Sequence, residues 1–291
     1  MDLKCYFQEI QDMGGVWHYA QEEKVQGSFS DQTQNGLFAL EDRSWWFRYR
    51  ADVISLFAER HLLKYRDIFD VGGGNGYTTM CMQKKGYTMA LLEPSYGACR
   101  NAKNRGIRTV VCGTLNKENV KDRCIPQILL LDVLEHIQDD TGFLQLMREK
   151  LSDDGRILLT VPALKVLWSS EDDAAGHYRR YTAEQLRETA VRAGFRVCRI
   201  SYFFSFLFLP ILLVRVGMEK IGIIKRDEKR TKKEREQLQR KQFQERKGLV
   251  QLGLGILEAV EIRKLKKGKM VRFGSSIICV LEKDSFEKRI T

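Results

Sequence analysis

Residues 67–76 read Asp-Ile-Phe-Asp-Val-Gly-Gly-Gly-Asn-Gly, an apolar run that passes directly into a glycine-rich loop, and a helical run follows at residues 77–84. Glycines at alternate positions let the backbone turn tightly and approach a ligand closely. The N-terminus of the next helix offers unpaired N–H groups to an anionic group. The stretch therefore predicts a strand, a ligand-binding loop and a helix in succession.

Short apolar runs alternate with longer amphipathic stretches beyond this loop, which is typical of βαβ units and a mostly parallel sheet. The capping-box pair Thr182 and Gln185 predicts the start of a helix, and Gly194 its end. We expect a turn at residues 152–155 and a helix over 44–60. The expected strands are residues 67–71, 87–93, 109–112, 127–132, 156–161, 195–200 and 275–281.

Glu93 ends the second expected strand, 17 residues after Gly76. A carboxylate at this place can accept hydrogen bonds from both hydroxyls of a ribose, the usual reason for an acid there in nucleotide-binding α/β folds. The loop reads GxGxG after an acid and not the dinucleotide pattern GxGxxG. It is better suited to a nucleoside that carries an amino acid than to a pyrophosphate.

With these motifs the chain resembles the class I S-adenosylmethionine-dependent methyltransferases. Residues 70–76 are similar to the family's first motif, Glu93 to its ribose-binding acid, residues 131–136 (LDVLEH) to its fourth-strand motif, and residues 151–162 to its fifth-strand region. The resemblance implies a Rossmann-like three-layer α/β sandwich. Its seven-stranded sheet would be mostly parallel with an antiparallel last strand, and a helical insertion would precede that strand.

The chain would then divide into four parts. We expect an N-terminal helical lid region at residues 1–60 and the cofactor-binding core at residues 61–200. An apolar and basic helical insertion would follow at residues 201–269, and the last core strand with a tail at residues 270–291.

The resemblance implies S-adenosylmethionine as the cofactor. Many members carry an acid after the third strand for the adenine amino group, whereas this chain has Thr114 at that place. The residues expected to bind the cofactor are Asp70, Gly72, Gly74, Gly76, Glu93, Thr114 and Asp132.

Two histidines are candidates for catalysis. Methyl transfer from a sulfonium needs nucleophile, carbon and sulfur in line, and a base only where the acceptor must lose a proton. His136 follows the fourth strand and His177 lies on a loop after the fifth, and each could instead be a hydrogen-bonded structural residue. No metal ligands are predicted, because the seven cysteines never pair as CxxC, but whether a base or a metal assists stays open.

Side chains near these histidines are expected to bind the acceptor, with arginines suited to an anionic group. Trp46 belongs to a second stretch, with Trp45, Arg48 and Arg50, that is either a lid over the cofactor or part of the core. The expected substrate-binding residues are Tyr178, Arg179, Arg180 and Trp46.

The net charge of +11 is unevenly distributed. Residues 1–224 carry 29 basic and 28 acidic side chains, whereas residues 225–291 carry 20 and 10. A uniformly basic protein that coats nucleic acid is thus excluded. Residues 225–247 predict a solvated helix or arm, and residues 249–265 an amphipathic helix.

The apolar run at residues 202–214 contains Pro210 and has 13 residues, fewer than the roughly 20 of a membrane-spanning helix. Together with the basic segments it could attach the chain to an anionic membrane surface. The alternatives are packing inside the domain or a homodimer interface.

We therefore expect a methyltransferase for a small-molecule, glycan or lipid-linked acceptor, acting on oxygen. Scattered cysteines and a start without a secretory signal favour the cytoplasm, with peripheral attachment to the inner face of the membrane. The alternatives are an RNA methyltransferase that uses the basic C-terminal region and a non-catalytic protein that binds the cofactor and a partner. Nucleic acid is the weaker of these partners, because no Asn-Pro-Pro-Tyr loop occurs.

Overall fold

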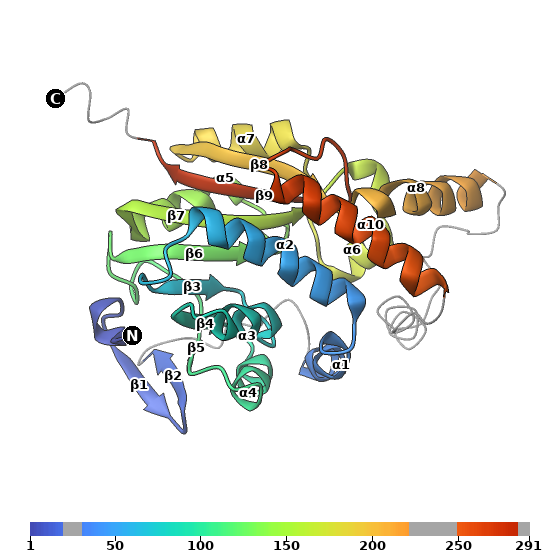
Figure 1. The fold of residues 1–291 in the computed structure, drawn as a ribbon. Helices are drawn as coiled ribbons and strands as arrows, with labels where there is room; N and C mark the ends of the chain where they lie inside the picture. The colour runs from blue at the N-terminus through green and yellow to red at the C-terminus, as the bar shows by residue number, and fades with distance from the viewer. Residues whose placement is uncertain (20–30, 221–248, 285–291) are drawn as a thin grey trace.

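A computed structural model describes residues 1–19, 31–220 and 249–284, and these form an α/β sandwich of three layers (Figure 1). One sheet has the order β1-β2-β5-β4-β3-β6-β7-β9-β8. Its strands are β1 (Ile10–Met13), β2 (Val16–Tyr19), β3 (Ile68–Val71), β4 (Met89–Glu93), β5 (Thr109–Cys112), β6 (Ile125–Leu131), β7 (Leu151–Pro162), β8 (Phe195–Phe203) and β9 (Ser276–Lys283).

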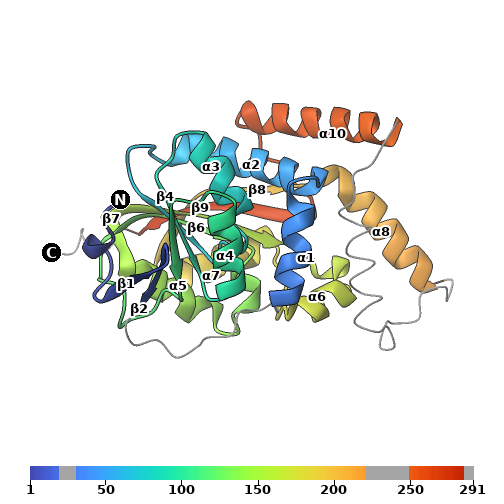
Figure 2. The same cartoon turned by 90° about the horizontal axis from the view of Figure 1, so that it is seen from below.

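The helices cover both faces of this sheet. Figure 2 shows α2, α3 and α10 on one face and α5 and α7 on the other. Their apolar side chains belong to the two clusters that cover these faces. The helices are α1 (Asp31–Glu41), α2 (Trp45–His61), α3 (Tyr77–Lys84), α4 (Tyr96–Asn104), α5 (Asp140–Lys150), α6 (Ser170–Ala175), α7 (Ala183–Arg192), α8 (Ser205–Lys220) and α10 (Leu249–Lys266), with 3₁₀ turns η1 (Leu3–Cys5), η2 (Leu134–His136) and η3 (Lys165–Leu167).

Strands β3 to β9 form the expected core. Strands β5, β4, β3, β6 and β7 run parallel, and β9 lies antiparallel between β7 and β8. Because these strands are buried on both faces, β3, β4 and β6 consist almost wholly of buried residues. Their carboxyl ends meet at one edge of the sheet, where the glycine-rich loop lies.

The expected count of seven strands is wrong, since the described residues form nine. The N-terminal region, expected to be helical, also contains the hairpin β1–β2, which turns at Gly14 and Gly15 with φ of 71° and 87°. Strand β2 then pairs in parallel with β5, the edge of the seven-stranded core. The hairpin thus covers backbone groups that an edge strand would expose.

Most expected element boundaries are close to the observed ones. Strand β5, helix α3 and the capping box of Thr182 and Gln185 occur as predicted. The turn expected at residues 152–155 is wrong, because they lie inside β7, at a shift in its register with β6. The apolar run is divided between β8 and α8, with Pro210 inside the helix. Residues 225–247 lie outside the described residues.

Helices α8 and α10 are joined to the core through one buried carboxylate. Glu261 of α10 accepts hydrogen bonds from the backbone N–H groups of Phe204 and Ser205, each at 2.7 Å. It also accepts from the hydroxyls of Tyr49 and Ser205. Among the described helices, none has the length and apolar character needed to cross a membrane.

Candidate functional site

Gly72 and Gly74 of the loop that follows β3 have left-handed backbone conformations, and only the first of them is tightly packed. Gly72 has φ of 73°, and a Cβ there would lie 2.6 Å from a methyl group of Val133. Gly74 has φ of 54°, but a Cβ there would meet no atom within 4 Å. Gly72 is thus required for packing, whereas the space beside Gly74 is open to a ligand.

Glu93 holds this loop against the end of β4. Its Oε2 accepts from the N–H of Gly74 and its Oε1 from the N–H of Ser95, both at 3.0 Å. The side chain is largely buried, and burial raises its pKa despite these two hydrogen bonds. Each carboxylate oxygen has a second lone pair, so Glu93 can still accept from two ligand hydroxyls.

Asp70 lies on β3, two residues before the first glycine of the loop. It is buried, accepts a hydrogen bond from the Thr79 hydroxyl at 2.5 Å, and does not line the cavity described next. Burial raises the pKa of its carboxyl to about 6, although the Thr79 hydrogen bond and the charge of Arg50 oppose the shift.

A cavity of about 660 Å³ opens at the carboxyl ends of the strands. Of the thirteen site residues expected from the sequence, nine line it: Gly72, Gly74, Glu93, Thr114, Asp132, His136, His177, Arg180 and Trp46. The other four do not: Asp70, Gly76, Tyr178 and Arg179. Gly76 instead caps α3 in a left-handed conformation.

Asp132 lines the cavity and has a left-handed backbone conformation, with φ of 57°. Its Oδ2 lies 2.8 Å from Nη2 of Arg50, and its Oδ1 accepts from the Thr160 hydroxyl at 2.9 Å. Arg50 also donates to Thr160. This pairing draws the first turns of α2 onto the strand ends.

Trp46 forms part of the cavity wall. Its ring stacks on Phe204, with centroids 5.5 Å apart and planes 9° from parallel. Trp45 is buried and packs edge-on against the same ring. Of the two interpretations of this stretch, core packing therefore describes Trp45, while Trp46 both packs and lines the cavity.

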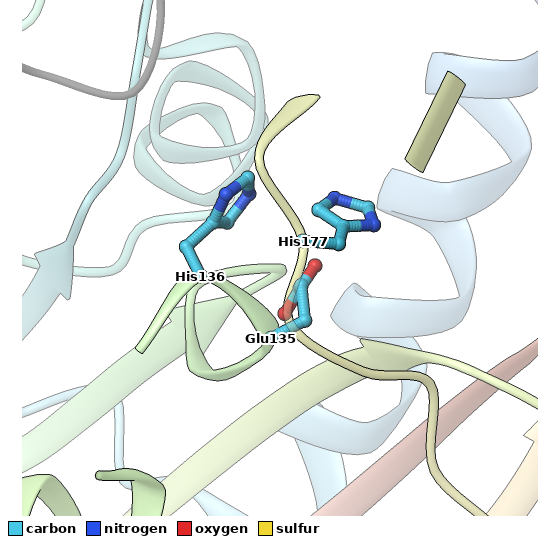
Figure 3. A group of neighbouring side chains, drawn as sticks. All are labelled: Glu135, His136 and His177. Atoms are coloured by element: carbon cyan, nitrogen blue, oxygen red, sulfur yellow. The ribbon is translucent and has the colours of Figure 1, made fainter. Parts of the chain in front are cut away.

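Glu135, His136 and His177 lie close together (Figure 3), and all three line the cavity. The His136 and His177 rings meet edge to face, with centroids 4.6 Å apart. Burial, and next to it the charge of His177, lower the pKa of His136 to about 4. Burial and the charge of Asp132 raise the pKa of Glu135 well above its usual range.

Asp172 fixes the loop that carries His177. It accepts from Nδ1 of His177 at 2.9 Å and from Nε and Nη2 of Arg180 at 2.7 and 3.0 Å. Burial opposes ionisation, but these hydrogen bonds and the charge of Arg180 lower the pKa of Asp172 to about 2. Arg180 therefore reaches the cavity already paired with a carboxylate.

Tyr178 and Arg179, the two residues after His177, do not line the cavity. Tyr178 is 55% exposed. Arg179 pairs with Asp140 at 2.7 Å and donates to the carbonyl of Gln138. Both remain predictions as substrate-binding residues, with neither at the cavity wall.

Three residues of the site are not among the catalytic or binding residues that the sequence predicts: Arg50, Glu135 and Asp172. Arg50 belongs to the stretch expected to be a lid or part of the core, and a charged residue on an otherwise buried helix face is a signal of pairing. Glu135 stands inside the LEH motif, but its burial is not visible in a sequence. Asp172 could have been found from Ser169, three residues earlier, with which it forms a capping box.

A family model for a methyltransferase domain matches residues 40–200, more than half of the chain. A comparison with curated proteins found no match. Similar solved structures include the [4+2]-cyclase SpnF, with 16% identity and a TM-score of 0.54 over 87% of this chain and 93% of that chain.

Phosphoethanolamine N-methyltransferase 2 of Haemonchus contortus, in complex with S-adenosyl-L-methionine, shares 15% identity, with a TM-score of 0.52 over 88% of this chain and 58% of that chain. A chain from the complex between the Haloferax volcanii Trm112 methyltransferase activator and a methyltransferase shares 13% identity, with a TM-score of 0.52 over 87% of this chain and 94% of that chain. At these identities the likeness shows the fold.

Proposed function

The chain belongs to the family of methyltransferase domains, and from this premise we propose that it methylates a hydroxyl group of a small-molecule, glycan or lipid-linked acceptor. The cofactor is S-adenosylmethionine. The observation that carries the proposal is the cavity itself, which is lined both by the glycine-rich loop with Glu93 and by the two histidines.

The glycine-rich loop and Glu93 fit a nucleoside that bears an amino acid. The open space beside Gly74 admits the ligand, and Glu93 has lone pairs for the ribose hydroxyls. Thr114 and Leu115 line the wall next to them, where the adenine ring would lie. Bound there, the cofactor supplies an electrophilic methyl group on a positively charged sulfur.

The two histidines and the residues that line the cavity with them would bind and orient the acceptor. His136 and His177 offer ring nitrogens to a hydroxyl group, and Arg180 offers positive charge to an anionic part of the acceptor. Trp46 and Leu167 line the same cavity and would exclude water from it. Displacement at carbon needs this alignment more than it needs a strong base.

The cavity mouth supports an acceptor with an apolar chain. Leu207 and Ile211 of α8 line the cavity, while Leu209 and Leu213 of the same helix are 57% and 64% exposed. One helix therefore leads from the site to an apolar surface, and such surfaces mark sites of lipid or protein contact. We propose that α8 rests on a membrane surface from which a lipid-linked acceptor enters.

The test of activity is transfer of labelled methyl groups from S-adenosylmethionine into lipid and polar cell extracts. Gly74→Arg should abolish transfer, because its side chain would fill the cofactor's place. Gly86→Arg is the matched control, since Gly86 also has positive φ, with open space and no place in the cavity. Label confined to RNA, or equal transfer by Gly74→Arg, would contradict the proposal.

The membrane contact is tested separately by flotation with anionic vesicles. The double variant Leu209→Ser/Leu213→Ser should lose most of its recovery with the vesicles. Val191→Ser, at a position on α7 that is 57% exposed, should keep it. Equal recovery of the two variants would refute membrane contact through α8.

A further inference from the structure

Glu135 is a buried acid whose carboxylate has no hydrogen-bond partner within the part of the chain that the structure describes. Its exposure is 1%, and neither Oε1 nor Oε2 accepts a hydrogen bond from the described residues. A buried polar group without a partner costs on the order of 1–3 kcal/mol, and more when it is charged. The carboxylate is nevertheless turned toward the two histidines of the cavity (Figure 3).

His177 is prepared to offer a lone pair in this group. The Asp172 carboxylate is paired with the guanidinium of Arg180 and accepts hydrogen bonds, so Nδ1 of His177 donates to it and Nε2 is left with its lone pair. Asp172 is itself held by Arg180 and by the N–H and hydroxyl of Ser169. A histidine whose second nitrogen donates to an anchored carboxylate is the usual arrangement of a metal ligand.

One ligand atom from each of Glu135, His136 and His177 lies within 4.8 Å of the other two. Atoms bound to one ion at about 2.1 Å lie up to roughly 4 Å apart, so modest side-chain rotations would bring them into range. We propose that these three residues bind a single divalent transition-metal ion, of the kind that imidazole and carboxylate ligands select, such as Zn²⁺, Co²⁺, Mn²⁺ or Fe²⁺.

The inference deepens and rests on the proposed function, because three protein ligands leave positions open toward the cavity. An acceptor hydroxyl bound there would release its proton to water more easily. Its oxygen would then form the new bond to the methyl carbon, while the carbon–sulfur bond breaks and its electron pair stays on the now neutral sulfur. The proposal therefore names a hydroxyl-bearing acceptor that can ligate a metal through oxygen.

The experiment uses the full chain, stripped with a chelator and then titrated with Co²⁺ or Zn²⁺ alone. We expect one ion per chain by elemental analysis after dialysis, and visible absorption bands of bound Co²⁺. His177→Ala and Glu135→Gln should lose at least 10-fold in affinity. His18→Ala is the matched control, since His18 packs on Tyr96 away from this cluster, and it should bind one ion as before.

Asp172→Asn tests the support of His177 and should weaken binding 10- to 100-fold. Calorimetry with S-adenosylmethionine, run on each variant, reports whether the fold is intact. Absence of stoichiometric metal in a chain that binds the cofactor, or equal affinity in His177→Ala and His18→Ala, would overturn the metal site. Metal binding without methyl transfer would instead refute the proposed function and leave the metal site standing.

Discussion

The guanidinium of Arg50, on α2, lies 2.8 Å from the Asp132 carboxylate at the end of β6, and both residues line the cavity. Arg50 is buried, and its Nη1 also lies within hydrogen-bonding distance of Thr78. The pair joins the N-terminal helices to the strand ends at a residue with left-handed backbone conformation. Arg50 therefore connects three elements around the cavity: α2, the end of β6 and α3.

Replacing Arg50 with alanine should lower the free energy of unfolding by about 1–3 kcal/mol, because it removes the ion-pair partner of the partly buried Asp132 and leaves that carboxylate the Thr160 hydroxyl among the described residues. Urea denaturation measures the change. Arg66→Ala breaks an ion pair with the exposed Asp154 and should cost under about 1 kcal/mol. Equal losses in the two variants would refute the importance of the Arg50–Asp132 pair.

Glu93→Gln should weaken S-adenosylmethionine binding by about 10- to 100-fold. The amide keeps the size of the side chain but turns an NH₂ group toward one of the two backbone N–H groups that Glu93 now accepts from. Calorimetry measures the affinity. Glu59→Gln, at an exposed ion pair with Lys85, should leave it unchanged, and a loss there would point to a general effect.

The pH dependence of stability should change when Asp70 becomes asparagine. The pKa of Asp70 is about 6 in the fold against an ordinary value of 3.8, so folding favours the protonated form. The group costs nothing below pH 3.8, and its cost grows as pH rises, reaching roughly 3 kcal/mol above pH 6. Asp70→Asn should therefore gain stability relative to the parent chain between pH 4 and pH 7.

Denaturation of both proteins at several pH values checks this sign. Thr79→Val is a second measurement, because it removes the hydrogen bond that lowers the Asp70 pKa. In the Thr79→Val background, the stability difference made by Asp70→Asn should still begin near pH 3.8 but should keep growing to a higher pH than in the parent chain, because the pKa of Asp70 in the fold is raised further. A stability difference that stays constant from pH 4 to pH 7 would show that Asp70 keeps its ordinary pKa.

Glu261→Gln should destabilise the chain by about 2–4 kcal/mol, since the amide replaces one of two oxygens that each accept from backbone N–H. Glu258→Gln, at a partly buried position on the same helix, should change stability by under about 0.5 kcal/mol. Thermal unfolding in parallel compares the two. Similar melting temperatures would mean that the Glu261 contacts contribute little.

Local patterns predicted much of this fold. The run from Asp70 to Gly76, the acid at Glu93 and the capping box at Thr182 each depend on a few neighbouring residues, and each lies on the element expected for it. The N-terminal hairpin was missed although Gly14 and Gly15 signal a turn, because strands β1 and β2 are only four residues long and mix polar with apolar side chains.

The candidate site was predicted only in part, because its remaining contacts join segments far apart in the chain. No spacing relates Arg50 to Asp132, or Glu261 to Tyr49. Glu135 is buried although it lies far in the chain from the loop that carries His177, where the N–H of Tyr178 donates to the Glu135 carbonyl. A sequence shows such residue types but not the environment that alters their chemistry.

The carboxylate of Glu261 also limits how residues 201–269 can be transferred between related proteins. Its partners lie on α2 and at the junction of β8 and α8, so the insertion is not a detachable module. A graft of residues 201–269 onto another methyltransferase would bring Glu261 and Ser205 but leave Tyr49 behind. A functional exchange would have to transfer α2 together with residues 201–269, so that Glu261 keeps its partners and α8 keeps its place beside the cavity.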